Sequence, residues 1–198
     1  MKSNDIADRL LLKGCVVGSA AVGKTSFFRR YREASSTGYY SWAVYDPTRF
    51  ETSSGEQEVC IELNDVRSTW QYPQFRSHIF RNTDVLMIFY SVTDRRSYHD
   101  VEKVWLLDAH NHCQGVPVVL VATKTDIREE AADCVSEAEG EELAKRISAQ
   151  VFVEVSLLCG EGLDDLMSEV VICAAEHKLR KRSEFQRASE PCFVCKIL

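Results

Sequence analysis

The chain has 198 residues, of which 45% are hydrophobic and 27% charged, a composition that suits one globular domain with a sizeable core and a short tail. It has no apolar run of the length that spans a membrane, about 18 residues, and no signal-peptide pattern, so we expect an intracellular protein. The net charge is -6 at pH 7, and this acidic balance argues against nucleic acid as a partner.

Short apolar runs alternate with amphipathic stretches along the chain. The apolar runs predict strands at 10–17, 59–64, 85–92, 117–123 and 150–156. The spacing of apolar residues predicts helices at about 25–33, 96–111, 136–149 and 162–182. Residues 34–56 are polar and rich in serine, threonine and glycine, so this stretch is expected to be mostly loop.

The alternation of strands and helices predicts the fold class. It indicates a single α/β domain over residues 1–182, with a mixed, mostly parallel sheet of about six strands and helices on both faces. Residues 183–198 are polar and lack periodicity, so we expect them to form a flexible tail. In such sheets ligands bind at the carboxyl ends of the strands, and the candidate motifs within the domain fall there.

A phosphate-binding loop is predicted between the first strand and the first helix. Residues 18–25 read GSAAVGKT and match the pattern G-x-x-x-x-G-K-[ST]. Such a loop turns backbone N–H groups inward at a helix N-terminus and cradles phosphate. Lys24 can reach the outer phosphates and serve catalysis, and Thr25 offers a hydroxyl to Mg²⁺. The candidate nucleotide contacts are Gly18, Ser19, Ala20, Ala21, Val22, Gly23, Lys24, Thr25 and Ser26.

Two later segments are candidates for reading the base. Thr123 and Lys124 precede Asp126, whose carboxylate can accept hydrogen bonds from the guanine N1–H and exocyclic amine. Adenine lacks this donor pair, and an unpaired buried carboxylate is costly. The stem of Lys124 can lie on the base, and the loop at Ser156 and Leu157, at the same sheet edge, can give an N–H to the base oxygen. Both segments together indicate guanine.

With these motifs the chain resembles the small GTPases of the Ras superfamily, and most closely their Rho/Rac branch. The Rho-like phrases are YDPTRFE at 45–51, VEKVW at 101–105, HC at 112–113 and LVATKTDIR at 120–128. The stretch from Asp126 to Ser156 is too short for the usual Rho insert helix. The resemblance implies a monomer that binds GTP or GDP with Mg²⁺, hydrolyses GTP, and contacts effectors and exchange factors through switches at 37–50 and 65–77.

The resemblance also assigns roles within the switches. Thr48 matches the catalytic switch I threonine that holds Mg²⁺ and senses the γ-phosphate, although a gap-free alignment places Ala43 there instead. Asp65 matches the switch II aspartate that binds Mg²⁺ through water. Ser68 replaces the glycine whose N–H faces the γ-phosphate. Thr69 replaces the catalytic glutamine that orients the attacking water.

These departures predict tight binding of GTP·Mg²⁺ with slow hydrolysis. Threonine at position 69 is too short to span water and phosphate, and the methyl of Ala20 crowds the space where the glutamine and an arginine finger would meet. Arg67 either neutralises phosphate charge or faces solvent. Two readings stay open: a GTPase switch with a low intrinsic rate, or a hydrolysis-deficient binding module that recruits effectors while persistently GTP-bound.

The end of the chain predicts membrane attachment. The last four residues, CKIL, form a C-a-a-X motif that predicts geranylgeranylation of Cys195. One lipid binds membranes only reversibly, so a second signal is expected. Palmitate on Cys192 or the basic run at 177–182 can supply it, and the basic run can also complement the helix dipole. We expect the cytoplasmic face of the plasma membrane or an endomembrane, with a cytosolic pool.

Overall fold

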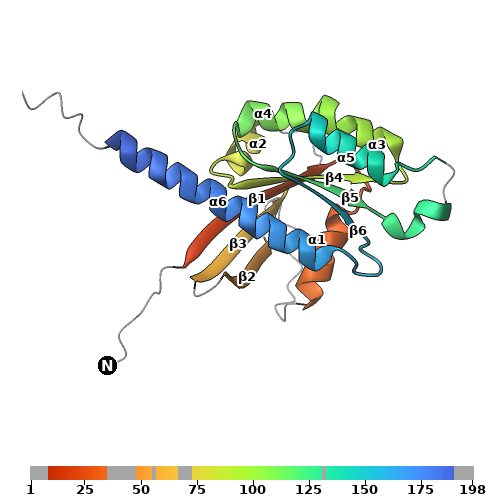
Figure 1. Ribbon diagram of the computed structural model, residues 1–198, viewed down its shortest axis with the longest axis horizontal. Helices are drawn as coiled ribbons and strands as arrows, with labels where there is room; N and C mark the ends of the chain where they lie inside the picture. Colours follow the sequence, from red (N-terminus) through yellow and green to blue (C-terminus); the bar gives the residue numbers. More distant parts are fainter. Residues whose placement is uncertain (1–8, 35–47, 55–56, 67–72, 131–132, 190–198) are drawn as a thin grey trace, which may run out of the picture.

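The structure, a computed structural model, describes residues 9–34, 48–54, 57–66, 73–130 and 133–189. At its centre is a six-stranded sheet with strand order β2-β3-β1-β4-β5-β6 (Figure 1). β2 runs antiparallel to β3, and all other neighbours are parallel, which confirms the predicted mixed, mostly parallel sheet. The strands are β1 Leu10–Gly18, β2 Thr48–Ser54, β3 Gln57–Asp65, β4 Val85–Ser91, β5 Val118–Thr123 and β6 Val151–Val155.

Helices cover both faces of this sheet, as predicted (Figure 1). α1 Lys24–Ala34 and α6 Leu163–Ser189 pack on one face and share its apolar core. The other face is covered by α2 Pro73–Phe80, α3 Arg95–Asp100, α4 Leu107–His112 and α5 Glu137–Arg146. A π-helical segment, Val101–Leu106, joins α3 to α4, and a 3₁₀ segment, Thr125–Glu130, follows β5. Within the described ranges, no helix is both long and apolar enough to cross a membrane.

Strand β4 shows why continuous apolar runs predict central strands. All of its residues are buried. Met87 and Phe89 belong to the core under α1 and α6, while Leu86 and Ile88 belong to the core on the opposite face, because successive side chains of a strand point to opposite sides. A strand covered on both faces therefore needs apolar residues at every position.

Two elements differ from the sequence prediction. The prediction of mostly loop at 34–56 is wrong for Thr48–Ser54, which form β2. β2 is an edge strand whose sequence, TRFETSS, offers little apolar alternation, and Phe50 anchors it by an edge-on contact with the Tyr31 ring at 5.0 Å. Helix α2 lies where no element was predicted, because its sequence of eight residues, PQFRSHIF, is too short to show a helical repeat of apolar residues.

Two predicted helices differ from those in the structure, one in its interior and the other at its C-terminal end. The helix expected at 96–111 consists of α3, the π-helical segment and α4, which adjoin one another. The helix expected at 162–182 continues to Ser189 as α6. No glycine or proline interrupts Leu163–Ser189, so nothing in the sequence stops the helix at residue 182. Residues 183–189, expected to begin the tail, are therefore helical.

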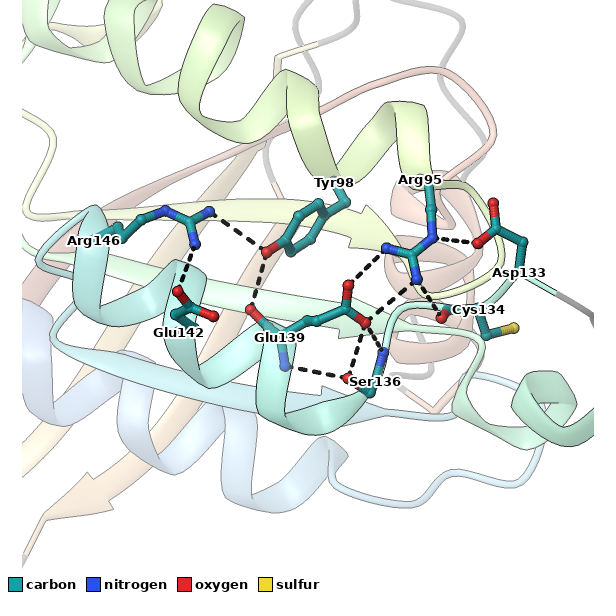
Figure 2. A network of polar contacts seen from close by, with 8 residues as sticks. All are labelled: Arg95, Tyr98, Asp133, Cys134, Ser136, Glu139, Glu142 and Arg146. Atoms are coloured by element: carbon teal, nitrogen blue, oxygen red, sulfur yellow. Dashed lines mark hydrogen bonds and ion pairs between the residues drawn. The ribbon is translucent and has the colours of Figure 1, made fainter.

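A polar network ties α3 to α5 (Figure 2). Arg95 Nη1 donates to Glu139 Oε1 at 2.7 Å, and Arg95 also contacts Asp133. Glu139 forms a capping box with Ser136 at the start of α5. The guanidinium of Arg95 holds the pKa of the Glu139 carboxyl at about 2, with hydrogen bonds from Ser136 adding to the effect. The network therefore holds the segment that leads into α5 against α3.

Glu139→Gln is expected to lower the free energy of unfolding by about 1 kcal/mol at pH 7. The effect stays small because 36% of the Glu139 side chain is exposed to solvent. The folded-state pKa of about 2 lies below the unfolded value of about 4.3. The carboxylate therefore contributes its stability above that pH and loses it as the pH falls toward 2.

Urea unfolding at pH 7 and at pH 3.5 would test this. The gap between wild type and Glu139→Gln should narrow on acidification. Glu141→Gln, an exposed change on the same helix, should alter stability by less than about 0.5 kcal/mol at either pH. An equal effect of Glu139→Gln at both pH values would show that the Arg95 pair is not the cause.

Candidate functional site

The loop between β1 and α1 has positive φ angles at three positions, and two of these positions are glycines. φ is positive at Gly18 (144°), Ala21 (61°) and Gly23 (101°), a region that favours glycine. A Cβ on Gly18 would lie 2.3 Å from the carbonyl oxygen of Phe89, and a Cβ on Gly23 would lie 2.8 Å from Cδ1 of Leu157. The two glycines therefore let the loop approach both β4 and the loop after β6.

Lys24 begins α1 and carries a buried positive charge. Lys24 is only 7% exposed. Its Nζ donates to the carbonyl oxygens of Gly18 at 2.6 Å and Ser19 at 2.7 Å. Burial lowers the pKa of Lys24, and the carboxylate of Asp65 partly opposes this effect. A buried cation at a helix N-terminus, in a tightly curled loop, is suited to an anion such as phosphate.

Thr123, the last residue of β5, connects this loop to the segment proposed to read the base. Its Oγ1 lies 2.7 Å from the carbonyl oxygen of Val22 and 3.0 Å from that of Tyr90. After it, Lys124 has a positive φ of 63°, and the chain enters the 3₁₀ segment that contains Asp126. The phosphate loop and the Asp126 segment are therefore held side by side.

The two candidate base-reading segments are in direct contact. Ser156 Oγ donates to Asp126 Oδ1 at 2.7 Å and accepts the N–H of Cys159 at 3.1 Å. Arg128 and Glu154 form an ion pair between the same two segments, with Nη1 and Oε2 2.9 Å apart. Neither residue of that pair was predicted as part of the site. The only sign of the pair in the sequence is that a basic residue follows β5 and an acidic residue lies in β6.

The candidate metal residues lie near neighbouring strand ends. Thr25 is exposed on the first turn of α1. Thr48 begins β2 opposite Leu63, and Asp65 ends β3 two positions later. Directly paired residues, and residues two apart on one strand, point to the same face of a sheet. Thr48 and Asp65 therefore share a face, although Thr48 is only 7% exposed.

The remaining predicted residues fall into two groups. Among the loop residues, Ala20, Ala21 and Ser26 are exposed, and the hydroxyl of Ser19 contacts Asp100 and Trp105. Those two partners were not predicted, because only long-range packing brings them to the loop. Outside the described residues lie the switch II and tail candidates Ser68, Thr69, Cys192 and Cys195, and the alternatives Ala43 and Arg67.

The residues that converge at this sheet edge agree with a comparison against known families. The sequence model of the Ras family matches residues 13–175, a span that includes the phosphate loop, Asp126 and Ser156. The chain belongs to the Ras family. Ras-family proteins are small GTP-binding switches with GTPase activity; they bind GTP and GDP, typically with Mg²⁺, and generally interact with effectors and exchange factors.

The geometry fits the ligands of a Ras-family protein. Lys24 provides a buried cation where phosphate would lie, and Asp65 provides a carboxylate close enough to affect the Lys24 pKa. Asp126 and Ser156, joined by their hydrogen bond, follow the carboxyl ends of β5 and β6. Asp65 at the end of β3, Lys24 after β1 and Asp126 after β5 thus follow one another along the carboxyl edge of the sheet, an arrangement that a nucleotide with its metal could span.

Proposed function

We propose that this Ras-family chain is a Rho-like switch that binds GTP and GDP with Mg²⁺ and hydrolyses GTP slowly. The observation that carries the proposal is the buried Lys24 in a loop linked through Thr123 to the Asp126–Ser156 pair. The assignment to the Rho branch rests on the phrases at 45–51, 101–105, 112–113 and 120–128.

At the phosphate end, the loop at 18–25 would hold the nucleotide through its backbone, and Lys24 would stabilise negative charge on the γ-phosphate during in-line attack by water. Thr25, Thr48 and Asp65 would hold Mg²⁺, with Asp65 acting through water. When bound, Mg²⁺ neutralises charge on the phosphate oxygens. The shared face of Thr48 and Asp65 supports this set over one in which Ala43 replaces Thr48.

At the base end, Asp126 would accept hydrogen bonds from the guanine N1–H and amine. The stem of Lys124 would lie on the base, and the loop at Ser156 and Leu157 would offer an N–H to the base oxygen. Ser156 and the Arg128–Glu154 pair hold this arrangement before any base arrives, and such preorganisation favours selective binding.

We attribute slow hydrolysis to Thr69. This cause predicts that a suitable replacement of Thr69 raises the rate of GTP hydrolysis. Thr69→Gln, which supplies a side chain long enough to orient water, is expected to raise the rate of GTP hydrolysis about tenfold or more. Adding Ala20→Gly, which removes a crowding methyl, should raise it further. Single-turnover phosphate release measures both, and Ser168→Gln, exposed on α6, is the control. An unchanged rate in both variants would refute this cause of slow hydrolysis.

The second candidate is a hydrolysis-deficient module that stays GTP-bound and recruits effectors, favoured by the same residues at positions 20 and 69. The nucleotide that co-purifies with the protein distinguishes the two, after extraction and chromatography. GTP would support the module. GDP would support a working switch with another water-positioning group, and Arg67 would be the first residue to replace. Adenine nucleotides, or none, would contradict both candidates.

Membrane attachment is proposed through a geranylgeranyl group on Cys195, assisted by palmitate on Cys192 or by basic residues of α6. Figure 1 shows α6 extending well past the sheet, and this part exposes Arg180, Lys181 and Arg182, which suit an anionic leaflet. The protein would act as a monomer at the cytoplasmic face of the plasma membrane or an endomembrane, with a cytosolic pool.

Cys195→Ser is expected to abolish labelling by a geranylgeranyl analogue and to shift the protein from the membrane fraction to the cytosol. Cys159→Ser, a change at an exposed cysteine of the domain, is the matched control and should keep both the label and the membrane fraction. Persistent label on Cys195→Ser would disprove the attachment site.

A further inference from the structure

The hydroxyl of Ser19 connects the phosphate loop to the helices on the opposite face of the sheet. Ser19 Oγ donates to Asp100 Oδ2 at 2.8 Å and accepts Nε1–H of Trp105 at 3.1 Å. The directions follow from chemistry, because an indole N–H can only donate and the hydroxyl proton is then free for the carboxylate. One of these bonds involves a charged acceptor and is of the stronger kind.

The backbone of Ser19 also contacts the lysine proposed to hold phosphate. Its carbonyl oxygen accepts Lys24 Nζ at 2.7 Å. A phosphate that draws Lys24 toward itself must therefore compete for, or share, the ammonium group that Ser19 holds. Any shift of the Ser19 backbone acts directly on the bonds that its side chain makes to Asp100 and Trp105.

The π-helical segment explains how both partners reach one hydroxyl. Asp100 and Trp105 are five positions apart, and in an α-helix such residues point about 140° apart. Val101–Leu106 is π-helical, and the i→i+5 repeat of a π-helix brings residues five apart onto one side. The wide turn thus places the carboxylate and the indole together on the side that faces the phosphate loop. π-helical turns occur frequently at functional sites.

The surroundings of Trp105 make its indole a reporter. Trp105 is only 3% exposed, yet a hollow of about 560 Å³ lined in part by Ala20, Asp100 and Trp105 adjoins it. If the loop moved, water from this hollow could replace the bond between Ser19 and the indole. Indole emission depends on such hydrogen bonding and solvent contact, so the fluorescence of Trp105 would change with the position of the loop.

We propose that Ser19 is a positioning residue, which holds the phosphate loop through Asp100 and Trp105 and transmits nucleotide occupancy to the π-helical segment. The inference rests on the proposed nucleotide binding. It adds a route by which binding of the nucleotide phosphates affects α3, α4 and the π-helical segment between them. Ser19 does not need to touch the nucleotide with its side chain for this role.

The test uses the full chain with Trp42→Phe and Trp70→Phe, so that Trp105 is the single tryptophan. Mg²⁺·GDP is added to nucleotide-free protein, and the emission of Trp105 is recorded. Release of a fluorescent GDP analogue is timed separately. Binding is expected to shift the emission. Ser19→Ala is expected to remove most of the shift and to speed GDP release about 30-fold or more, as for the loss of a charged and a neutral hydrogen bond.

Two further variants separate positioning from simple stability. Ser19→Thr keeps the hydroxyl and should retain both the emission shift and the slow release. Trp105→Phe keeps the ring but loses the donor, and should speed release about threefold, as for one neutral hydrogen bond. A purely structural role would instead lower the melting temperature of Ser19→Ala while leaving its emission shift intact, and that result would overturn the proposal.

The outcomes distinguish this inference from the proposed function. If GDP binds but the Trp105 emission does not change, or Ser19→Ala releases GDP at the wild-type rate, the positioning role is wrong and the nucleotide site stands. If the wild-type chain binds no guanine nucleotide, the proposed function is wrong, and the positioning role is lost with it.

Discussion

Lys24→Ala is expected to weaken GDP binding by about 100-fold or more. Lys24 is a buried cation that touches two carbonyl oxygens of its own loop, and a nucleotide would place phosphate charge beside it. Truncating one partner of a buried, hydrogen-bonded charge pair costs about 2–5 kcal/mol, and about 1.4 kcal/mol is tenfold in affinity. Titration with a fluorescent GDP analogue measures the change.

The same variant should not lose stability when nucleotide is absent. Burial lowers the pKa of Lys24, so the folded state disfavours the charged form at neutral pH, and this penalty fades as the pH rises through the folded-state pKa. Lys24→Ala removes the penalty and is expected to melt at the same temperature as nucleotide-free wild type or higher. Lys145→Ala, whose side chain is 79% exposed, should change neither property.

Unchanged GDP affinity in Lys24→Ala would mean that the phosphates lie elsewhere. A combined loss of affinity and stability would mean that Lys24 is mainly a structural residue. The proposed role requires the two properties to separate, because residues that serve a ligand are often unfavourable for the empty fold.

The central strands and the phosphate loop could be predicted because local sequence determines them. A strand covered on both faces needs consecutive apolar residues, as in β4. The loop needs glycine at Gly18 and Gly23, where a Cβ would collide with Phe89 and Leu157. Asp126 and Ser156 were found separately, and the parallel register of β5 and β6 brings their segments to one edge.

The features that could not be predicted depend on contacts between residues that are distant in sequence. β2 is an edge strand whose Phe50 packs on Tyr31, a residue distant in sequence, and its own sequence has the composition of a loop. A helical pattern at 96–111 does not reveal a π-helical turn, and without that turn Trp105 would not meet Ser19. Arg128 pairs with a glutamate on the next strand. Each of these features follows from packing between elements, which periodicity within one element does not encode.

Asp126→Asn is expected to change the preferred base from guanine to xanthine. The carboxylate of Asp126, already bonded to Ser156, can accept from both the N1–H and the amine of guanine. An asparagine presents one acceptor and one NH₂ donor, so its NH₂ would oppose the guanine amine. Xanthine has a carbonyl oxygen there and would pair with it. Loss of a charged hydrogen bond with an unmatched donor should weaken GDP binding by on the order of 100-fold.

This preference is measured by letting GDP, xanthosine diphosphate (XDP) and ADP each compete with the same fluorescent nucleotide for the protein. Asp165→Asn, exposed on the first turn of α6, removes an equal charge and should keep the guanine preference. A loss of binding to all three nucleotides alike would mean that Asp126 supports the loop through Ser156 without reading the base. A gain for XDP can arise only if the side chain faces the base edge, because support of the loop gives no reason to favour one purine over another. The exchange of preference, more than the loss of affinity, therefore decides whether this sheet edge reads guanine.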